Sequence, residues 1–447
     1  MQQPIISVSG LRGILGLSLS PEVVCRYVAA FVGQLPEGPI LLARDSRPSG
    51  LPLAEVIRGT LILQGRDVCD VGIMATPTVG VMIRELECVG GIQISASHNP
   101  PQYNGVKLMG GNGRVIGAAQ GSLVLESFQT QRISWAPHDE LGEAITAPDL
   151  IGPHLDKVLE TVGGAAIAKR KFKVLLDCNG GAGSLLGLAL LEKLGCQVTV
   201  VGGTPDGDFL HPPEPTAENL TDICDQVKAA KVDVGFCQDP DADRLAVIDE
   251  NGRYLGEEYT VALCLDNVLK KSPGPVVINC ATSRMNEDIA AKYKSKVTRS
   301  SVGEANVTEQ MVRNCAVFGG EGSGGPIDPR VGYVRDSFVG MANVLDLMTR
   351  RKKKISALAD ALPRYEIVKE KIDFEVDSLE SLRPHFESIF PEAEIQTGDG
   401  LRLQWPDRWL LIRGSNTEPI IRIIAESTTE KQSQQMCEEA GRALRGN

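Results

Sequence analysis

Three aspartates stand at every second position in the segment QDPDADR, residues 238–244. They are Asp239, Asp241 and Asp243, and the β-rich run VDVGFC ends two residues before the first of them. Alternate residues of an extended segment point to the same side, so the three carboxylates gather on one face. Clustered carboxylates repel one another unless a cation neutralises them, and their hard oxygens suit Mg²⁺ or Ca²⁺. The segment therefore predicts a divalent-cation site.

Two known aspartate motifs resemble this loop but fit it poorly. A calcium EF-hand would have its twelfth-position glutamate at Glu250, but its sixth position needs glycine and is Arg244. Its flanks must also be helices, whereas the runs on both sides here favour strands. The D-x-D-x-[TV] motif of haloacid-dehalogenase-type enzymes fits only in part, because its fifth position is Asp243. A solvated acidic turn is a minor alternative for three carboxylates at the end of an apolar strand.

A second group of polar residues lies in ISASHNPPQYNGVKL, where Ser97 follows a strand-like run. His98 is its neighbour and Lys107 comes ten residues later. Adjacent Ser and His side chains do not form a nucleophile and base pair without a third group, so this motif alone would indicate only a turn. The glycine loop GGEGSGG adds Glu321 and Ser323, and alone it would indicate a flexible turn.

The segment RGSNTEPIIRII combines a tight polar loop with basic residues on both sides. Guanidinium groups, hydroxyls and backbone amides together are what a phosphate dianion requires. An ordinary polar hairpin would not explain two arginines around the loop of an acidic protein. The candidate phosphate ligands are Arg413, Ser415, Asn416, Thr417 and Arg422. The glycines of LDCNGGAGSLLG fit a dinucleotide fingerprint only weakly, because Leu186 takes the third position.

The composition excludes several classes of protein. The 447 residues include 46 Lys+Arg and 57 Asp+Glu, a net charge of −11, so general binding to nucleic acid or anionic lipid is not expected. No apolar stretch reaches the ~18 residues of a membrane helix, and the N-terminus lacks the pattern of a signal peptide. Eleven dispersed cysteines without C-x-x-C favour free thiols in a reducing cytoplasm over disulfides or zinc.

Strand-like runs alternate with helical patterns over most of the length, which predicts α/β layers with mixed or parallel sheets. The last part has strands KIDFEV, LRLQW, WLLIRG and IIRIIAE and helices at 379–389 and 430–445, a smaller α+β module. The length and the Pro-rich breaks predict four domains. Their expected ranges are 1–150, 151–256, 257–363 and 364–447.

Together the motifs resemble the α-D-phosphohexomutase family, which includes phosphoglucomutase, phosphomannomutase and phosphoglucosamine mutase. The resemblance runs from end to end in the family's order: SGLRG, ARDSRPSG, SASHNP, DPDADR, GEGSGG and RGSNTEP. The last four look like the family's phosphoserine, metal, sugar and phosphate loops, one in each predicted range. The resemblance implies three similar α/β domains and a smaller α+β C-terminal domain around a central cleft.

The family resemblance implies that hexose or hexosamine 6-phosphate and 1-phosphate are interconverted through a phosphoserine and a bisphosphate intermediate. Ser97 would carry the phosphoryl group, and one Mg²⁺ would bind Ser97 and the three aspartates. A hexose bisphosphate would act as activator. Arg12, Arg244 and Lys107 would supply positive charge, and His98 a hydrogen bond. Other cations are expected to lower the pKa of Lys107 enough for it to act as a base.

The sugar would be bound by Glu321 and Ser323 and by the segment SSVGEAN, which contributes Gly303 and Glu304. A carboxylate at Glu304 would favour an ammonium at C2 of the sugar, which indicates glucosamine phosphate over glucose or mannose phosphate. Alternatively, Glu304 stabilises the positive end of a helix over 305–313. The chain departs from the family pattern at Gly325, where many members have His, at Pro240 in place of Gly and at Val8 in place of Thr.

Two other functions are compatible with the same site residues. A metal-dependent sugar phosphatase would release inorganic phosphate, and a non-catalytic protein would only bind sugar phosphate. The second requires the loss of a catalytic residue, and none is lost. The sequence does not predict an oligomeric state.

Overall fold

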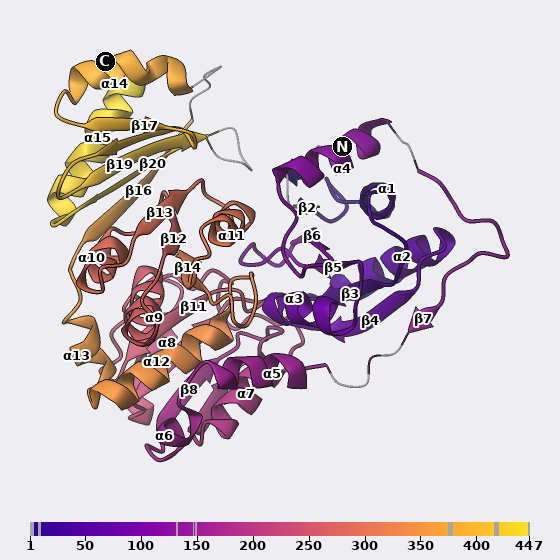
Figure 1. Cartoon of the computed structure of the whole chain (residues 1–447), viewed down its shortest axis with the longest axis horizontal. Coiled ribbons are helices and arrows are strands. Elements are labelled where there is room, and N and C mark those ends of the chain that lie inside the picture. The colour runs from indigo at the N-terminus through magenta and orange to yellow at the C-terminus, as the bar shows by residue number, and fades with distance from the viewer. Residues whose placement is uncertain are drawn as a thin grey trace.

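The computed structural model describes residues 4–7, 10–130, 133–145, 147, 150–373, 379–414 and 420–445. Within these ranges the chain forms four β-sheets with helices packed against them (Figure 1). We number the four units domains I to IV in chain order. Each sheet lies inside one of the four ranges expected from the sequence, and the boundaries between the ranges stay a prediction.

Domain I contains a seven-stranded mixed sheet in the order β1-β2-β6-β5-β3-β4-β7. Its strands are β1 Ile5–Ser7, β2 Gly10–Ile14, β3 Ile40–Arg44, β4 Val68–Ile73, β5 Gly90–Ile94, β6 Tyr103–Gly110 and β7 Ala144–Ile145. Its helices are α1 Pro21–Val32, α2 Gly50–Leu63, α3 Thr76–Glu85 and α4 Ala118–Thr130.

Domains II and III each contain a four-stranded sheet, ordered β11-β10-β8-β9 and β13-β12-β14-β15. Domain II comprises α5 Gly152–Glu160, α6 Gly164–Ala168, β8 Lys173–Asp177, α7 Ser184–Lys193, β9 Gln197–Val201, α8 Thr221–Ala230, β10 Val234–Gln238 and β11 Leu245–Asp249. Domain III comprises α9 Glu257–Lys271, β12 Val276–Asn279, α10 Met285–Lys292, β13 Val297–Ser300, α11 Glu304–Arg313, β14 Phe318–Glu321, β15 Gly325–Ile327, α12 Ser337–Arg351 and α13 Ile355–Ala359.

One four-strand pattern occurs in all three of these sheets. The strand orders β6-β5-β3-β4, β11-β10-β8-β9 and β15-β14-β12-β13 correspond position by position. In each, three strands are parallel and the fourth forms an antiparallel hairpin with its neighbour. This fourth strand lies at the sheet edge in domains II and III, whereas in domain I the sheet continues beyond it with β2 and β1. The expectation of three similar α/β domains with mixed sheets is confirmed.

Domain IV is a five-stranded antiparallel sheet in the order β16-β20-β19-β18-β17. Its strands are β16 Glu366–Ile372, β17 Glu394–Thr397, β18 Leu401–Gln404, β19 Trp409–Gly414 and β20 Ile421–Ser427, and its helices are α14 Arg383–Ile389 and α15 Glu430–Arg445. Strand β17 was not expected from the sequence, because its side chains are mostly exposed. A 3₁₀ turn over Leu379–Leu382 takes the first part of the expected helix 379–389.

The helix starts follow ordinary capping chemistry. Ser20 accepts a hydrogen bond from the backbone amide of Val23, and proline stands at the first turn of α1. Asp336 accepts from the amides of Phe338 and Val339, and this fixes the start of α12. Among the described residues, none of the helices has the length and apolar character needed to cross a membrane.

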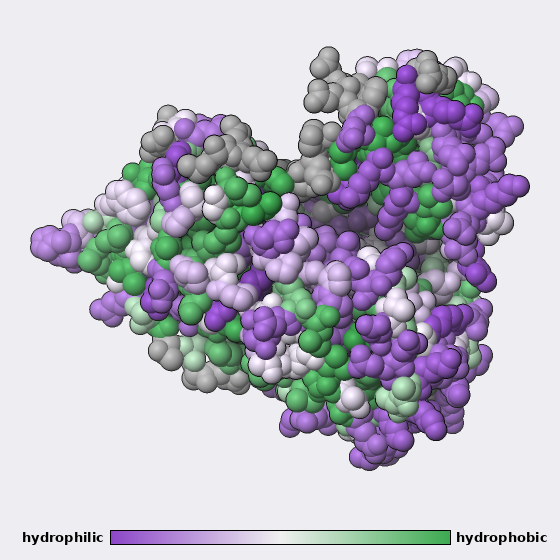
Figure 2. All heavy atoms as spheres, turned by 180° about the vertical axis from the view of Figure 1, so that it is seen from behind, coloured by the Kyte–Doolittle hydropathy of each residue, from purple (hydrophilic) through white to green (hydrophobic). Residues whose placement is uncertain are grey.

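Domains II and III share one large hydrophobic core, whereas domains I and IV are built mainly on clusters of their own. The shared core joins Val174 and Leu176 of β8 with Phe318 of β14 and Phe338 of α12. The core of domain I lies under β3, β5 and β6, and that of domain IV lies between its sheet and α15. The molecule is correspondingly hollowed between domains I and IV (Figure 2).

Replacing Phe338 by alanine tests whether the shared core unfolds as one unit. The ring is fully buried, so its loss should cost about 3 to 5 kcal/mol and lower the melting temperature of domains II and III together. Calorimetry with hydrogen exchange would measure both effects. Leu185→Ala is the control, because that side chain is 58% exposed and its loss should change little. Weakened protection in domain III alone would contradict the shared core.

Candidate functional site

The motif loops occupy the same place in the repeated fold. The Ser97 loop joins β5 to β6, the triple-aspartate loop joins β10 to β11, and the GEGSGG loop joins β14 to β15. Each is therefore the connection of the antiparallel hairpin that follows the parallel strands of its sheet. The RGSNTEP segment similarly joins β19 to β20 in domain IV, although residues 415–419 lie outside the described part of the chain.

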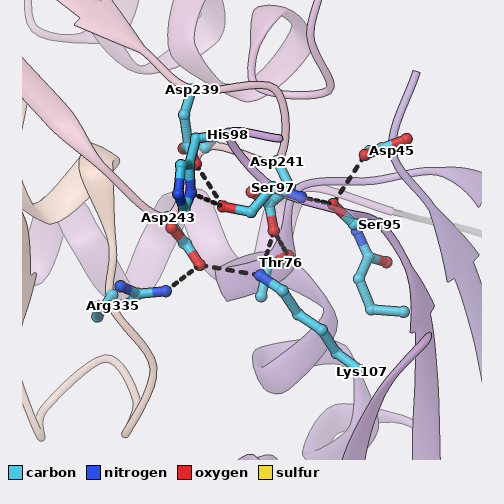
Figure 3. A network of polar contacts seen from close by, with 12 residues as sticks. Asp45, Thr76, Ser95, Ser97, His98, Lys107, Asp239, Asp241, Asp243 and Arg335 are labelled. Atoms are coloured by element: carbon cyan, nitrogen blue, oxygen red, sulfur yellow. Dashed lines mark hydrogen bonds and ion pairs between the residues drawn. The ribbon is translucent and has the colours of Figure 1, made fainter. Parts of the chain in front are cut away.

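Ser97 is 1% exposed and has a left-handed backbone conformation, with φ of 51°. This conformation is uncommon for a residue with a side chain. The Ser97 hydroxyl donates to Oδ2 of Asp239 at 2.8 Å, so the first and second motifs meet directly (Figure 3). The Ser97 amide donates to the Ser95 hydroxyl, which in turn donates to Asp45 at 2.7 Å.

Arg47 fixes the Ser97 loop through hydrogen bonds to its backbone carbonyls. Its guanidinium donates to the carbonyls of Ser97 and Asn99, each at 2.6 Å, and to the carbonyl of Pro100 at 2.8 Å. Arg47 is fully buried and forms an ion pair with Asp45 at 3.1 Å. Charge-assisted bonds to several carbonyls fix a loop more firmly than a single turn would, so the Ser97 hydroxyl has a defined position.

The three aspartates are fully buried, and one carboxylate oxygen from each lies within 4.8 Å of the others. The Oδ1 atoms of Asp241 and Asp243 are buried without a hydrogen-bond partner among the described residues. Oδ2 of Asp241 accepts from the Thr76 hydroxyl at 2.5 Å. Buried acceptors of this kind need a donor or a cation, and an all-oxygen set suits a hard divalent ion. The residues therefore fit a metal ion.

Two cations from other domains contact the same carboxylates. Lys107 of domain I pairs with Asp241 and, at 3.0 Å, with Asp243, while Arg335 of domain III donates to Oδ2 of Asp243 at 2.6 Å. Burial alone would raise the pKa of Asp243, but Arg335 and Lys107 outweigh burial and lower it. Burial raises the pKa of Asp239, and the two neighbouring aspartates raise it further.

The expected lowering of the pKa of Lys107 is wrong for this arrangement. Burial does disfavour the ammonium, but Asp241 and Asp243 outweigh burial and raise the pKa. Spacing along the chain does not show that two carboxylates lie in direct contact with the amine. Lys107 is therefore a cation at neutral pH in this structure.

The other predicted groups around Ser97 lie close to the aspartates. Arg12 donates to the side chain of Asn99 at 3.1 Å. Arg244 donates its backbone amide to Asp239, while its guanidinium lies 3.8 Å from Glu257. Nδ1 of His98 lies 3.4 Å from the Ser97 hydroxyl. Burial, followed by the charge of Arg244, lowers the pKa of His98, so its ring is neutral.

The predicted sugar residues gather on one side of the aspartates. Oε1 of Glu321 accepts from Asn279 at 2.8 Å and from the amide of Gly303 at 2.9 Å. Glu304 is the first residue of α11, as the alternative interpretation required, and its side chain also pairs with Arg335 at 3.0 Å. Ser323 is half-buried in the loop next to Glu321.

The predicted phosphate residues are described only in part. Arg413, at the end of β19, forms an ion pair with Asp399 at 3.1 Å. Arg422 lies directly opposite Arg413 in the antiparallel ladder. Oδ2 of Asp399 also accepts from the amide of Val302 in domain III at 2.8 Å, so this carboxylate connects the two domains. Ser415, Asn416 and Thr417 lie outside the described residues.

Several residues of this network were not predicted to take part. Arg47 and Asp45 stand in the motif ARDSRPSG. Two opposite charges in this motif were a signal that could have predicted their part in the network. Thr76, Asp399 and Arg335 had no comparable signal. They stand far along the chain from the residues they contact, and only the fold brings them together.

The chain was compared with known protein families. It matches the phosphoglucomutase/phosphomannomutase domains in order: alpha/beta/alpha domain I over residues 4–133, domain II over 153–252, domain III over 257–365 and the C-terminal domain over 351–442. Among curated proteins, a phosphoglucomutase/phosphomannomutase of Thermococcus kodakarensis is 37% identical, with 96% of each chain covered. A probable phosphoglucosamine mutase of Methanopyrus kandleri is 31% identical, over 96% of this chain and 95% of the relative.

Solved structures give the same result. A phosphoglucomutase/phosphomannomutase family protein of Burkholderia thailandensis superposes with a TM-score of 0.86 at 26% identity, covering 99% of this chain and 97% of that one. An N-acetylphosphoglucosamine mutase of Aspergillus fumigatus, solved with GlcNAc-6P and magnesium, shares the fold with a TM-score of 0.60 at 13% identity, covering 100% and 96%. The matched domains span nearly the whole chain and contain all of the motif loops. The chain belongs to the phosphoglucomutase/phosphomannomutase family and is a phosphohexomutase, an isomerase that acts by phosphoryl transfer.

Proposed function

We propose that Ser97 is the phosphoryl carrier of this phosphohexomutase. In the first half-reaction the phosphoryl group leaves Oγ of Ser97 and bonds to the free hydroxyl oxygen of a hexose monophosphate, while the proton of that hydroxyl ends on Oγ of Ser97. The bisphosphate then turns over in the site. Its other phosphoryl group returns to Oγ of Ser97, and the isomerised monophosphate leaves. A hexose bisphosphate would also activate unphosphorylated enzyme by the second of these steps.

The observation that carries this proposal is the hydrogen bond from the Ser97 hydroxyl to Asp239. Of the two serines in the SASHNP loop, Ser97 is the one that points at the aspartates. The hydrogen bond joins it to a set of carboxylates suited to a cation. Phosphoryl transfer depends on neutralising charge and on holding donor and acceptor in line. The loop carbonyls held by Arg47 and the cation Lys107 supply position and charge for such a step.

Asp239, Asp241 and Asp243 would hold one Mg²⁺, together with a phosphate oxygen on Ser97. When bound, the ion would supply positive charge next to the transferring phosphoryl group. Lys107 supplies a further charge from domain I and, as a protonated amine, can donate a hydrogen bond to the reacting oxygens. His98, with its neutral ring, can accept or donate a hydrogen bond beside Oγ of Ser97.

We further propose glucosamine phosphate as the preferred substrate. Glu304 directs Oε2 to Arg335, but its Oε1 is buried without a hydrogen-bond partner among the described residues. An ammonium at C2 of the sugar would give this oxygen a charge-assisted hydrogen bond, which a neutral hydroxyl gives more weakly. The relative from Methanopyrus kandleri, named a probable phosphoglucosamine mutase, supports this choice.

Glucose or mannose phosphate is the second candidate. The relative from Thermococcus kodakarensis, at 37% identity, is named a phosphoglucomutase/phosphomannomutase. In addition, Arg335 already neutralises part of the charge of Glu304, which weakens the attraction for an ammonium.

The non-reacting phosphate of the substrate would bind in domain IV, between Arg413, Arg422 and the loop residues Ser415, Asn416 and Thr417. Arg413 is 5% exposed and is oriented by Asp399, so its guanidinium is fixed before a ligand arrives. Fixed donors reduce the entropy lost on binding. Binding energy at this end can then be used to orient the reacting hydroxyl.

The first test concerns the carrier. Ser97→Ala should lower kcat by roughly 10³-fold or more, because no other group can take the phosphoryl group. Mass spectrometry should find phosphate on Ser97 in the wild type, and more of it after incubation with glucose 1,6-bisphosphate. Ser127→Ala, a change in α4, is the control and should behave as the wild type. Full turnover by Ser97→Ala would exclude the mechanism.

The second test concerns the metal. Asp241→Asn removes one negative charge from a buried set of three, so Mg²⁺ affinity measured by calorimetry should fall by roughly tenfold or more. The value of kcat should fall with it. Asp222→Asn, at an exposed position of α8, should change neither quantity. Unchanged Mg²⁺ binding in Asp241→Asn would remove this loop as the metal site.

The third test concerns the sugar. The ratio of kcat/KM for glucosamine 1-phosphate to that for glucose 1-phosphate should exceed one and fall by about tenfold in Glu304→Gln, the change expected when a charged acceptor becomes neutral. Because the ratio compares two substrates in one enzyme, a general loss from the broken Arg335 pair cancels. A wild-type preference for glucose 1-phosphate, or an unchanged ratio, would favour the second candidate.

A further inference from the structure

Arg335 connects three carboxylates that come from two domains. Its Nη2 donates to Asp243 at 2.6 Å, its Nη1 lies 3.0 Å from Oε2 of Glu321, and its Nε donates to Oε2 of Glu304 at 3.0 Å. Its backbone amide also donates to Glu304 at 3.1 Å. The side chain is 12% exposed. A single guanidinium therefore joins the metal loop of domain II to both predicted sugar carboxylates of domain III.

The space for this side chain is left by a glycine. A Cβ atom on Gly325 would overlap the Arg335 side chain, at 2.7 Å from its Cγ and 2.9 Å from its Cβ. Gly325 lies directly opposite Glu321 in the β14–β15 hairpin and is not among the glycines with positive φ. Its backbone would therefore accept another residue, and the three atoms nearest to an added Cβ all belong to Arg335.

The backbone of Arg335 is itself fixed. The next residue, Asp336, begins α12 and accepts from Nε2 of His154 at 2.8 Å. Nδ1 of the same imidazole lies 2.9 Å from the hydroxyl of Thr78 in domain I. All three side chains are buried. The guanidinium thus extends from a backbone that contacts from three domains hold in place. A residue that positions other side chains needs such a fixed backbone.

We propose that Arg335 is a positioning residue that orients Glu304 and Glu321 toward the sugar and neutralises Asp243, from the space that Gly325 leaves. This rests on the proposed function of the site. Arg335 occupies Oε2 of both glutamates, so Oε1 of Glu304 is left for the sugar. Without Arg335, two glutamates would face three aspartates, and like charges would push the hairpin loops apart.

The proposal predicts that a cation at position 325 can replace one at position 335. Arg335→Ala should lower kcat/KM for glucosamine 1-phosphate by roughly 100-fold, since several charge-assisted hydrogen bonds are lost. The rescue uses Arg335→Gly, which also removes the Cβ atom 2.9 Å away, and adding Gly325→Lys to it should recover about tenfold or more. Adding Gly325→Met instead fills the same space without charge and should recover nothing. Arg335→Lys alone should also lose activity, because an ammonium cannot bridge three carboxylates as the planar fork does.

Two readouts separate positioning from folding and from failure of the proposed function. The dissociation constant for glucosamine 6-phosphate, measured by calorimetry on the same variants, should rise in Arg335→Ala and in Arg335→Gly, and fall again when Gly325→Lys is added to Arg335→Gly. Melting temperatures should not follow that order. Equal recovery by Lys and Met would show packing alone and overturn the proposal, as would wild-type affinity in Arg335→Ala. If the wild type bound glucosamine 6-phosphate without converting it, the proposed reaction would be wrong. The dissociation constants would still test the positioning role of Arg335.

Discussion

Mutual repulsion among the three buried aspartates is the constraint on which the rest of the site depends. Two unit charges about 4 Å apart repel by roughly 4 kcal/mol in a partly polar protein environment, and here three carboxylates lie within 4.8 Å of one another. Domain II supplies all three but none of the side-chain cations that contact them. Lys107 comes from domain I and Arg335 from domain III, so side chains of two other domains offset the repulsion within this loop.

The repeated fold explains how such distant groups meet. Each of the first three domains follows its parallel strands with an antiparallel hairpin, and the hairpin connection contains the groups predicted for the site: a hydroxyl, a set of carboxylates or a glycine loop. A tight connection between paired strands has few degrees of freedom, so its side chains keep one orientation. Left-handed φ values at Ser97 and Ala242 are consistent with this, because such conformations persist only where the surroundings hold them.

The sequence was sufficient for features encoded locally. Alternation of apolar runs gave the layers, spacing by two gave the aspartate face, and motif order gave the family. Position 335 could not be found this way, because its three partners lie 31, 92 and 14 residues away and become neighbours only through the β14–β15 hairpin. The prediction of a lowered pKa for Lys107 was wrong for the same reason. Whether that pKa is raised or lowered depends on which charges are in direct contact with the amine, and spacing along the chain does not show these contacts.

Domain IV relates to the rest differently, and its contacts indicate how the distal phosphate can be coupled to the sugar. It has its own core and meets domain III through a small apolar cluster that includes Cys280 and Trp409. Beside that cluster, Asp399 holds Arg413 on one side and the amide of Val302 on the other, next to Gly303 and Glu321. A phosphate on Arg413 would compete for the charge that holds Asp399. If the proposed phosphate and sugar sites are correct, Asp399 is a carboxylate that contacts both the phosphate-binding arginine and the backbone next to the sugar residues.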